Sequence, residues 1–283
     1  MNWIILAVLG GFFSNVYNFS NRYVLKDQGD PLAFGWFLEA SRLLIFLLIA
    51  IINASFASIF SLPIHSLLLL LALGFVEVLS IYAIVHMHAY THLSISTIIA
   101  RTRVLWIPLL AFFFLQESLK FSEYIGIVIL FLGLGIAVAP KKIFVDKGIA
   151  FSYLSAFVSA IIAILQKLLA DGIPISTIMV FMSLPSAIVL PIFMKDSSHR
   201  LTRIFKDRLW IKFAASLANV LAMYFYIFAL TVGPVSKVSG IYQAMLIASV
   251  FAGIIFLNER EDLKKKIVGS IIVIAGVVLL TVY

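Results

Sequence analysis

The residues that could do chemistry in this chain are ionisable side chains set inside long apolar segments. Glu39 and Arg42 stand three positions apart, and Glu77 follows in the next apolar segment. Side chains at this spacing share one helical face, so Glu39 and Arg42 are expected to neutralise each other, with a substrate contact as the alternative. Glu77 has no opposite charge in its own segment. It therefore either pairs with an arginine of segment 93–115 or acts as a proton site.

Histidines gather where the third apolar segment ends, in the sequence HMHAYTH at 86–92. His88 and His92 stand four residues apart and could share a metal ion, which makes a metal-dependent membrane enzyme the competing hypothesis. The other two histidines outside this run lie in or near loops, and no carboxylate cluster completes a site. No phosphate-binding Gly-rich loop, nucleophile elbow or HExxH is present. We expect no enzyme, metal or cofactor, and we retain Glu39, Glu77 and His88 as candidates for proton coupling.

The elements that carry these residues are expected to be transmembrane helices. Of 283 residues, 63% are hydrophobic and 12% charged, fractions far outside those of soluble domains. Each apolar segment is close to the roughly 20 residues that cross about 30 Å of hydrocarbon. Ten spans leave no room for a soluble catalytic or nucleic-acid-binding module, and no cysteine is present for disulfides. The spans are expected at 3–22, 32–52, 66–87, 93–115, 123–139, 148–168, 175–194, 210–230, 236–257 and 267–283.

Basic residues predict the orientation of these spans. Fifteen lysines and arginines fall on the side that holds the first, third, fifth, seventh and ninth loops, against three on the other side. The positive-inside rule then places the side with fifteen basic residues in the cytoplasm and both termini outside. The net charge of +8 thus indicates membrane orientation and not a nucleic-acid partner.

The second half of the chain repeats the first at an offset of 142 residues. Tyr82 falls on Tyr224, Arg101 on Gln243 and Glu117 on Glu259. The repeat predicts two five-helix units, residues 1–140 and 148–283. Because five is odd, the second unit must cross the membrane in the opposite sense, an inverted repeat typical of secondary transporters. The predicted fold is therefore an all-α membrane protein of ten transmembrane helices.

Polar stripes along the expected helices indicate a substrate cavity. Asn15 and Asn18 recur with Arg22 at helical spacing, which predicts a face that lines a cavity and not lipid. Arg103 lies about 200° around a helix from Arg101, so it is expected to snorkel or pair elsewhere. The candidates for the cavity are Asn15, Asn18, Arg42, Tyr82, Ser94, Thr97, Arg101, Tyr224, Ser239 and Gln243.

Small residues mark the last span of each half. Gly126 and Gly133 correspond to Gly269 and Gly276, and Gly135 lies beside them. Glycines at such spacing permit close helix packing, and contact with a second copy in a homodimer is the alternative.

Two segments carry a family resemblance: LSISTIIARTRVLWIPLLAFFFLQESL and the Gly-spaced GIVILFLGLGIAV that follows it. Together they resemble the repeat unit of EamA-type transporters in the drug/metabolite transporter superfamily. Pro108 keeps the family's mid-helix proline, whereas Val250 replaces it in the second copy. The resemblance implies a ten-helix alternating-access carrier, and it implies termini in the cytoplasm, opposite to the charge count.

Together these patterns predict a multi-pass carrier of the cell membrane. We expect secondary transport of small polar organic metabolites such as amino acids, by rocking of the two units, with a nucleotide-sugar-type exchanger as the alternative. Glu117 and Glu259 are expected at opposite faces of the membrane, where each stays solvated or caps the helix that follows it.

Overall fold

The computed structural model describes residues 2–25, 30–55, 59, 61–90, 99–138, 147–206, 208–248, 251 and 262–282. Within these ranges the chain forms helices and turns without strands. The first half contains α1 (Trp3–Leu25), α2 (Pro31–Ile52), α3 (Ile64–Tyr90), α5 (Arg103–Leu115) and α6 (Phe121–Val138). The second half contains α7 (Lys147–Ala170), α8 (Ile175–Val189), η2 (Leu190–Phe193), α9 (Ser197–Ile204), α10 (Leu209–Val232), α11 (Val235–Ala244) and α13 (Leu263–Val282).

Seven helices of the described part are long and apolar enough to cross a membrane. They are α1, α2, α3, α7, α8 with η2, α10 and α13, and the apolar helix α6 is slightly shorter. The all-helical membrane class is thereby confirmed. The helices α5 and α11 cover only parts of the expected spans 93–115 and 236–257, because turn residues at Thr102 and Met245 interrupt these segments and because 91–98, 249–250 and 252–261 lie outside the described residues.

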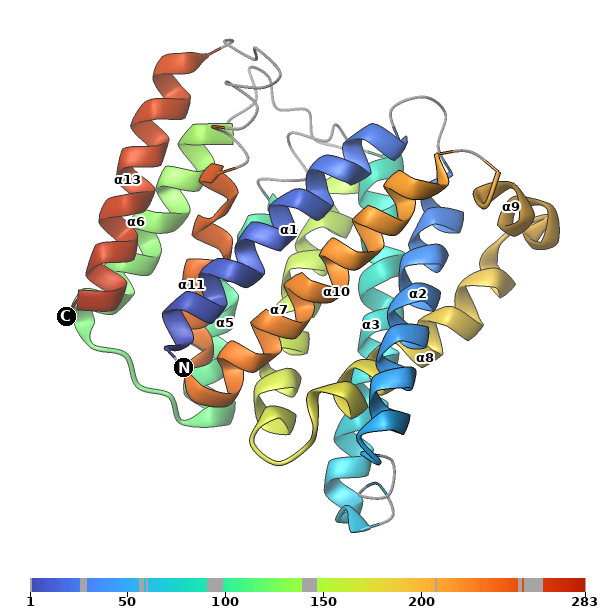
Figure 1. Cartoon of the computed structure of the whole chain (residues 1–283). Coiled ribbons are helices and arrows are strands. Elements are labelled where there is room, and N and C mark those ends of the chain that lie inside the picture. The colour runs from blue at the N-terminus through green and yellow to red at the C-terminus, as the bar shows by residue number, and fades with distance from the viewer. Residues whose placement is uncertain are drawn as a thin grey trace.

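Equivalent helices of the two halves run in opposite directions (Figure 1). The first helix α1 rises from the lower edge of the bundle, whereas its counterpart α7 descends, and α6 and α13 are opposed in the same way. The two termini lie at the lower ends of α1 and α13, and the α7–α8 and α10–α11 turns also lie on the lower side of the bundle. This arrangement is the one that an inverted repeat requires.

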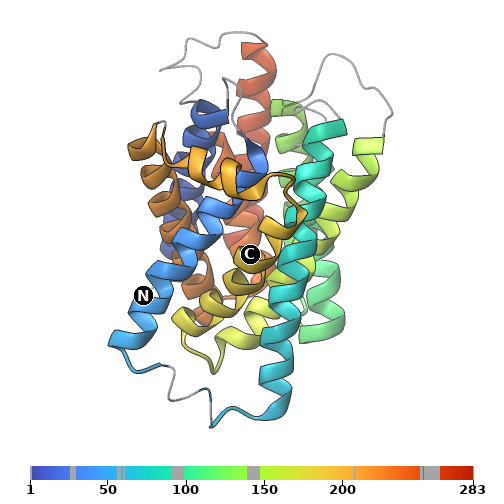
Figure 2. The same ribbon diagram turned by 90° about the vertical axis from the view of Figure 1, so that its right-hand side faces the viewer.

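The two halves interlock instead of forming separate bundles. The helix α1 packs against α10 and α11, and the equivalent contacts join α7 to α3 and α5. Two further pairs, α2 with α8 and α6 with α13, also combine equivalent helices of the two halves. Figure 2 shows α8 crossing between α2 and α3, the three helices that the buried polar cluster described below joins.

Glycines bring α6 and α13 into backbone contact. A Cβ atom added at Gly126, Gly133, Gly269 or Gly276 would lie 2.6 to 2.9 Å from backbone atoms of the facing helix. The expectation of close packing is confirmed for these four positions. Gly135 differs, since an added Cβ would meet nothing within 4 Å.

A polar contact at the upper edge ties the start of α2 to α9. The Asp30 carboxylate accepts from the Leu32 and Ala33 N–H groups as an N-cap, and it also accepts from Arg200 at 2.5 and 2.6 Å. Burial alone would raise the pKa of Asp30, but the hydrogen bonds and charge of Arg200 outweigh burial and hold the pKa below its usual 3.8. Asp30 therefore stabilises the fold fully above pH 3.8, and this contribution is lost as the pH falls through the lowered pKa.

We expect Asp30→Asn to lower the free energy of unfolding at pH 7 by about 0.5 to 1 kcal/mol, because asparagine keeps the cap but loses the charge pair. Asp30→Ala should cost about 1 kcal/mol more, since the cap is lost as well. Thermal unfolding of detergent-purified protein between pH 3 and 7 measures both variants. Asp171→Asn is the matched control, because Asp171 makes an exposed i, i+4 pair with Lys167. A wild-type acid transition that persists unchanged in Asp30→Asn would contradict the assignment.

Candidate functional site

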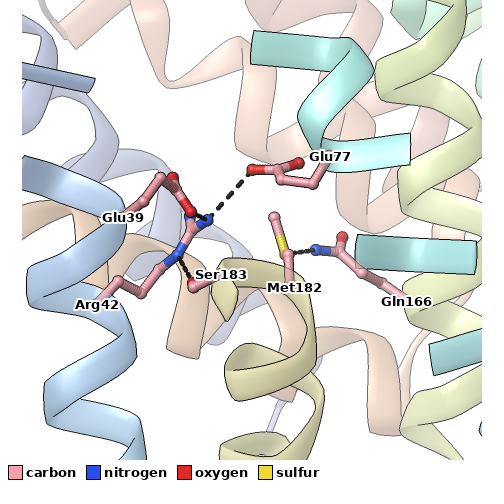
Figure 3. Close-up of polar contacts among 6 residues, drawn as sticks. All are labelled: Glu39, Arg42, Glu77, Gln166, Met182 and Ser183. Atoms are coloured by element: carbon pink, nitrogen blue, oxygen red, sulfur yellow. Dashed lines mark hydrogen bonds and ion pairs between the residues drawn. The ribbon is translucent and has the colours of Figure 1, made fainter. Parts of the chain in front are cut away.

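A buried ion cluster joins three helices at the interface of the halves (Figure 3). Arg42 of α2 donates through Nη2 to Glu39 of the same helix and, at 3.2 Å, to Glu77 of α3. Its Nε donates to Ser183 of α8 at 2.7 Å. Glu39 is 7% exposed, Arg42 is 2% exposed and Glu77 is 8% exposed, so bulk water does not solvate their charges.

The local sequence explains how these side chains meet. Glu39 and Arg42 share one face of α2 because they stand three positions apart. Gly74 lies one turn before Glu77 on α3, and a Cβ there would come within 2.6 Å of the Phe181 carbonyl oxygen and of the Pro185 ring. The absence of a side chain at Gly74 thus lets α3 approach α8 closely enough for Glu77 to reach the cluster.

The cluster confirms one prediction and corrects another. The self-neutralising pair of Glu39 and Arg42 is present, extended by a second carboxylate. The expectation that Glu77 pairs with an arginine of segment 93–115 is wrong, because Arg42 of α2 is its partner. Sequence spacing could not show this contact, since it joins residues of two different helices. With both carboxylates ionised the cluster carries a net charge of −1, which is costly within a membrane.

Ser183 is a site residue that the sequence analysis missed. It is fully buried in α8, two positions before Pro185, and it extends the cluster into the second half of the chain. Next to it, Met182 accepts a hydrogen bond from Gln166 of α7 through its sulfur at 3.3 Å. A serine in an apolar helix is ordinarily a packing residue, so its type alone did not single it out.

A second polar region surrounds α11. Asn15 of α1 donates through Nδ2 to the carbonyl of Met245, where α11 has just ended. The Ser239 hydroxyl lies 2.7 Å from the Tyr226 hydroxyl of α10. Gln243 is 1% exposed, and neither of its amide atoms has a hydrogen-bond partner among the described residues. Three residues that were predicted to line the cavity therefore lie at α11: Ser239 and Gln243 belong to this helix, and Asn15 bonds to the residue that follows it.

Arg101 and Arg103 flank Thr102 at the start of α5. Thr102 is a turn residue with right-handed helical dihedral angles (φ −58°, ψ −16°), and it separates Arg101 from the start of α5. The two guanidinium groups are close enough to repel one another, and Arg101 also lies near Tyr242 of α11. Both side chains are half-buried.

The other predicted residues have different surroundings. The Tyr82 ring lies tilted against the His86 ring with centroids 4.0 Å apart, and Tyr224 stacks on Phe46 with centroids 6.5 Å apart. Asn18 is half-buried on α1. Ser94, Thr97 and the side chain of His88 lie outside the described residues, as does Glu259. No group of three metal-ligating side chains occurs in the part of the chain that the structure describes.

Glu117 links the halves at the lower edge. Its carboxylate accepts from the Val235 and Ser236 N–H groups at 2.9 and 3.1 Å, so it caps α11 of the other half. The prediction that Glu117 caps the helix after it is wrong, because Glu123 holds that place by accepting from the Lys120 N–H, whereas Glu117 remains partly exposed. A cavity of about 420 Å³ opens beside this cap, lined in part by Glu117 and Lys167.

Comparison with known proteins agrees with this architecture. Residues 1–139 and 146–282 match the EamA-like transporter family. The chain belongs to this family, and it is a multi-pass membrane transporter of the drug/metabolite type, as the sequence resemblance predicted. A solved structure described as "Crystal structure of protein" has a TM-score of 0.76 at 12% identity, over 99% of this chain and 96% of that one, which shows a shared fold. No curated protein matches the chain.

Proposed function

We propose that the chain is a ten-helix secondary active transporter of small polar organic metabolites, such as amino acids, that works by alternating access in the cell membrane. The observation that carries this proposal is the ion cluster of Glu39, Arg42 and Glu77. It lies where α2 and α3 of one half meet α8 of the other. A charged group at such an interface is costly for packing alone, and its place fits the substrate and ion sites of inverted-repeat carriers.

The charge of the cluster supports coupling to protons. Two carboxylates share one guanidinium, so uptake of a single proton by Glu39 or Glu77 makes the group neutral. A movement that carries the cluster between the two sides of the membrane is easier for the neutral form than for the charged one. We propose that this proton couples transport to a pH gradient.

The packing of the halves supports a particular kind of movement. Because α1 packs on α10 and α3 packs on α7, the two sequence halves cannot separate as rigid bundles without breaking most helix contacts. We therefore expect the moving bodies to combine helices of both halves, in place of the rocking of two complete five-helix units.

Transport in proteoliposomes tests this proposal. Purified protein is reconstituted and tested across a metabolite panel, with and without a pH gradient. The gradient should stimulate transport of at least one solute by the wild type, and Glu77→Gln should lose that stimulation while keeping exchange of the same solute across the membrane. Asp171→Asn, which alters an exposed acid, should behave as wild type. Equal stimulation in wild type, Glu39→Gln and Glu77→Gln would exclude the cluster as the proton site.

A further inference from the structure

The fourth helix of each half is interrupted at nearly equivalent positions, Thr102 and Met245, which differ by one residue from the register of the repeat. In the first half the helix that contains Arg101 breaks at Thr102 before α5 begins. In the second half α11 ends at Ala244, one residue after Gln243, and Met245 is a turn residue. Since Arg101 and Gln243 are equivalent in the repeat, both breaks follow the same element of the unit. Interrupted helices at a repeat interface expose backbone and side-chain groups to a bound solute.

Polar groups without full partners lie at these breaks. Gln243 is 1% exposed and can offer four hydrogen bonds, none of which is made within the described residues. Tyr242 lies beside it in the chain, and its ring is 4.8 Å from that of Tyr226. An amide buried without partners is costly, so a ligand that bonds to it would be stabilised.

Arg101 and Arg103 supply positive charge at the same place. Each acid of the described spans has a different partner: Glu39 and Glu77 bond to Arg42, Glu117 to the backbone of α11, and Glu123 to Lys237. The helix α5, which begins at Arg103, packs against α11, and Arg101 interacts electrostatically with Tyr242, the residue next to Gln243. Two half-buried guanidiniums without an acid beside them in the described structure favour a bound anion.

We propose that the two helix breaks bind the oxyanion group, carboxylate or phosphate, of a small organic solute. Arg101 and Arg103 supply the charge, and Gln243 with Tyr242 orients the group by hydrogen bonds. Guanidiniums suit this task because they bind carboxylate and phosphate through two parallel N–H donors. This inference rests on the proposed function, and it narrows the proposed substrate from polar organic metabolites to organic anions.

Ligand binding by the purified full-length protein tests the inference apart from transport. Thermal unfolding in detergent is followed at constant ionic strength with succinate, glycerol phosphate, inorganic phosphate, leucine or glycerol. Succinate or glycerol phosphate should raise the unfolding temperature in a concentration-dependent way, and the stronger of the two identifies the oxyanion. Leucine and glycerol should have little effect. A response to inorganic phosphate alone, or an equal response to glycerol, overturns the inference.

Variants distinguish recognition from a structural role. Arg101→Gln and Arg103→Gln should each lower the apparent affinity for the organic anion by about tenfold or more. Without ligand, each should unfold at the same temperature as wild type or higher, because the repulsion of two like charges is relieved. Arg101→Lys keeps the charge and should retain most of the binding. Arg203→Gln, at an exposed position on α9, is the control. Undiminished anion binding in both glutamine variants overturns the inference.

The two proposals fail separately. Anion binding that depends on the arginines, without any transport in proteoliposomes, would exclude the transporter function and leave the site intact. Transport of neutral solutes only, with no anion binding, would exclude the anion site and leave the transporter function intact.

Discussion

Arg42→Met is expected to lower the free energy of unfolding by about 3 to 5 kcal/mol, because it leaves two buried carboxylates without their shared partner. Methionine fills a similar volume, so the loss reports the charge and not a cavity. The measurement is thermal or denaturant unfolding of the purified protein in detergent, together with the yield of monodisperse protein. The neighbouring hydroxyl of Ser183 would also lose its donor, a smaller effect.

A triple variant separates the fold from the coupling. Glu39→Gln, Arg42→Met and Glu77→Gln together remove every charge of the cluster, and such neutral replacements of buried ion groups are often tolerated. We expect the triple variant to regain most of the stability lost in Arg42→Met. Its transport should no longer respond to a pH gradient, since no group of the cluster can take up a proton. If the triple variant were as unstable as Arg42→Met, the loss would come from packing of the Arg42 side chain and not from unpaired charge.

The sequence predicts local features of this protein well. Helix positions follow from apolar length, and the Glu39–Arg42 pair follows from a spacing of three on one helix. The inverted repeat follows from an odd number of spans in each copy. The glycines of α6 and α13 were identified as packing residues because their spacing recurs in both halves.

Contacts between distant segments are what the sequence could not predict. Glu77 reaches Arg42 only because Gly74 allows α3 to approach α8, and no spacing within α3 contains that information. The turn at Thr102 could not be predicted either, because neither proline nor glycine marks an interruption there.

Gly133→Ala and Gly135→Ala are expected to change stability in opposite directions, although they make the same substitution two residues apart on α6. A methyl group at Gly133 would lie 2.7 Å from the Val273 nitrogen and 2.9 Å from the Gly269 carbonyl oxygen, so α6 and α13 would have to separate. Overpacking of this kind costs about 1 to 3 kcal/mol. At Gly135 the methyl group meets no atom within 4 Å, and alanine favours a helix over glycine by about 1 kcal/mol.

The unfolding midpoints of the two variants, measured in one detergent, therefore test the α6–α13 contact. The two variants have the same amino-acid composition, so a difference between them reports the position of the methyl group. We expect Gly133→Ala below wild type and Gly135→Ala at or above it, with Gly269→Ala behaving like Gly133→Ala because its added Cβ would meet the Ala137 nitrogen at 2.6 Å. Equal midpoints for Gly133→Ala and Gly135→Ala would show that the helices are not in backbone contact. Because α6 and α13 are the last spans of the two halves, this contact also decides whether the ends of the inverted units stay together when the other helices move.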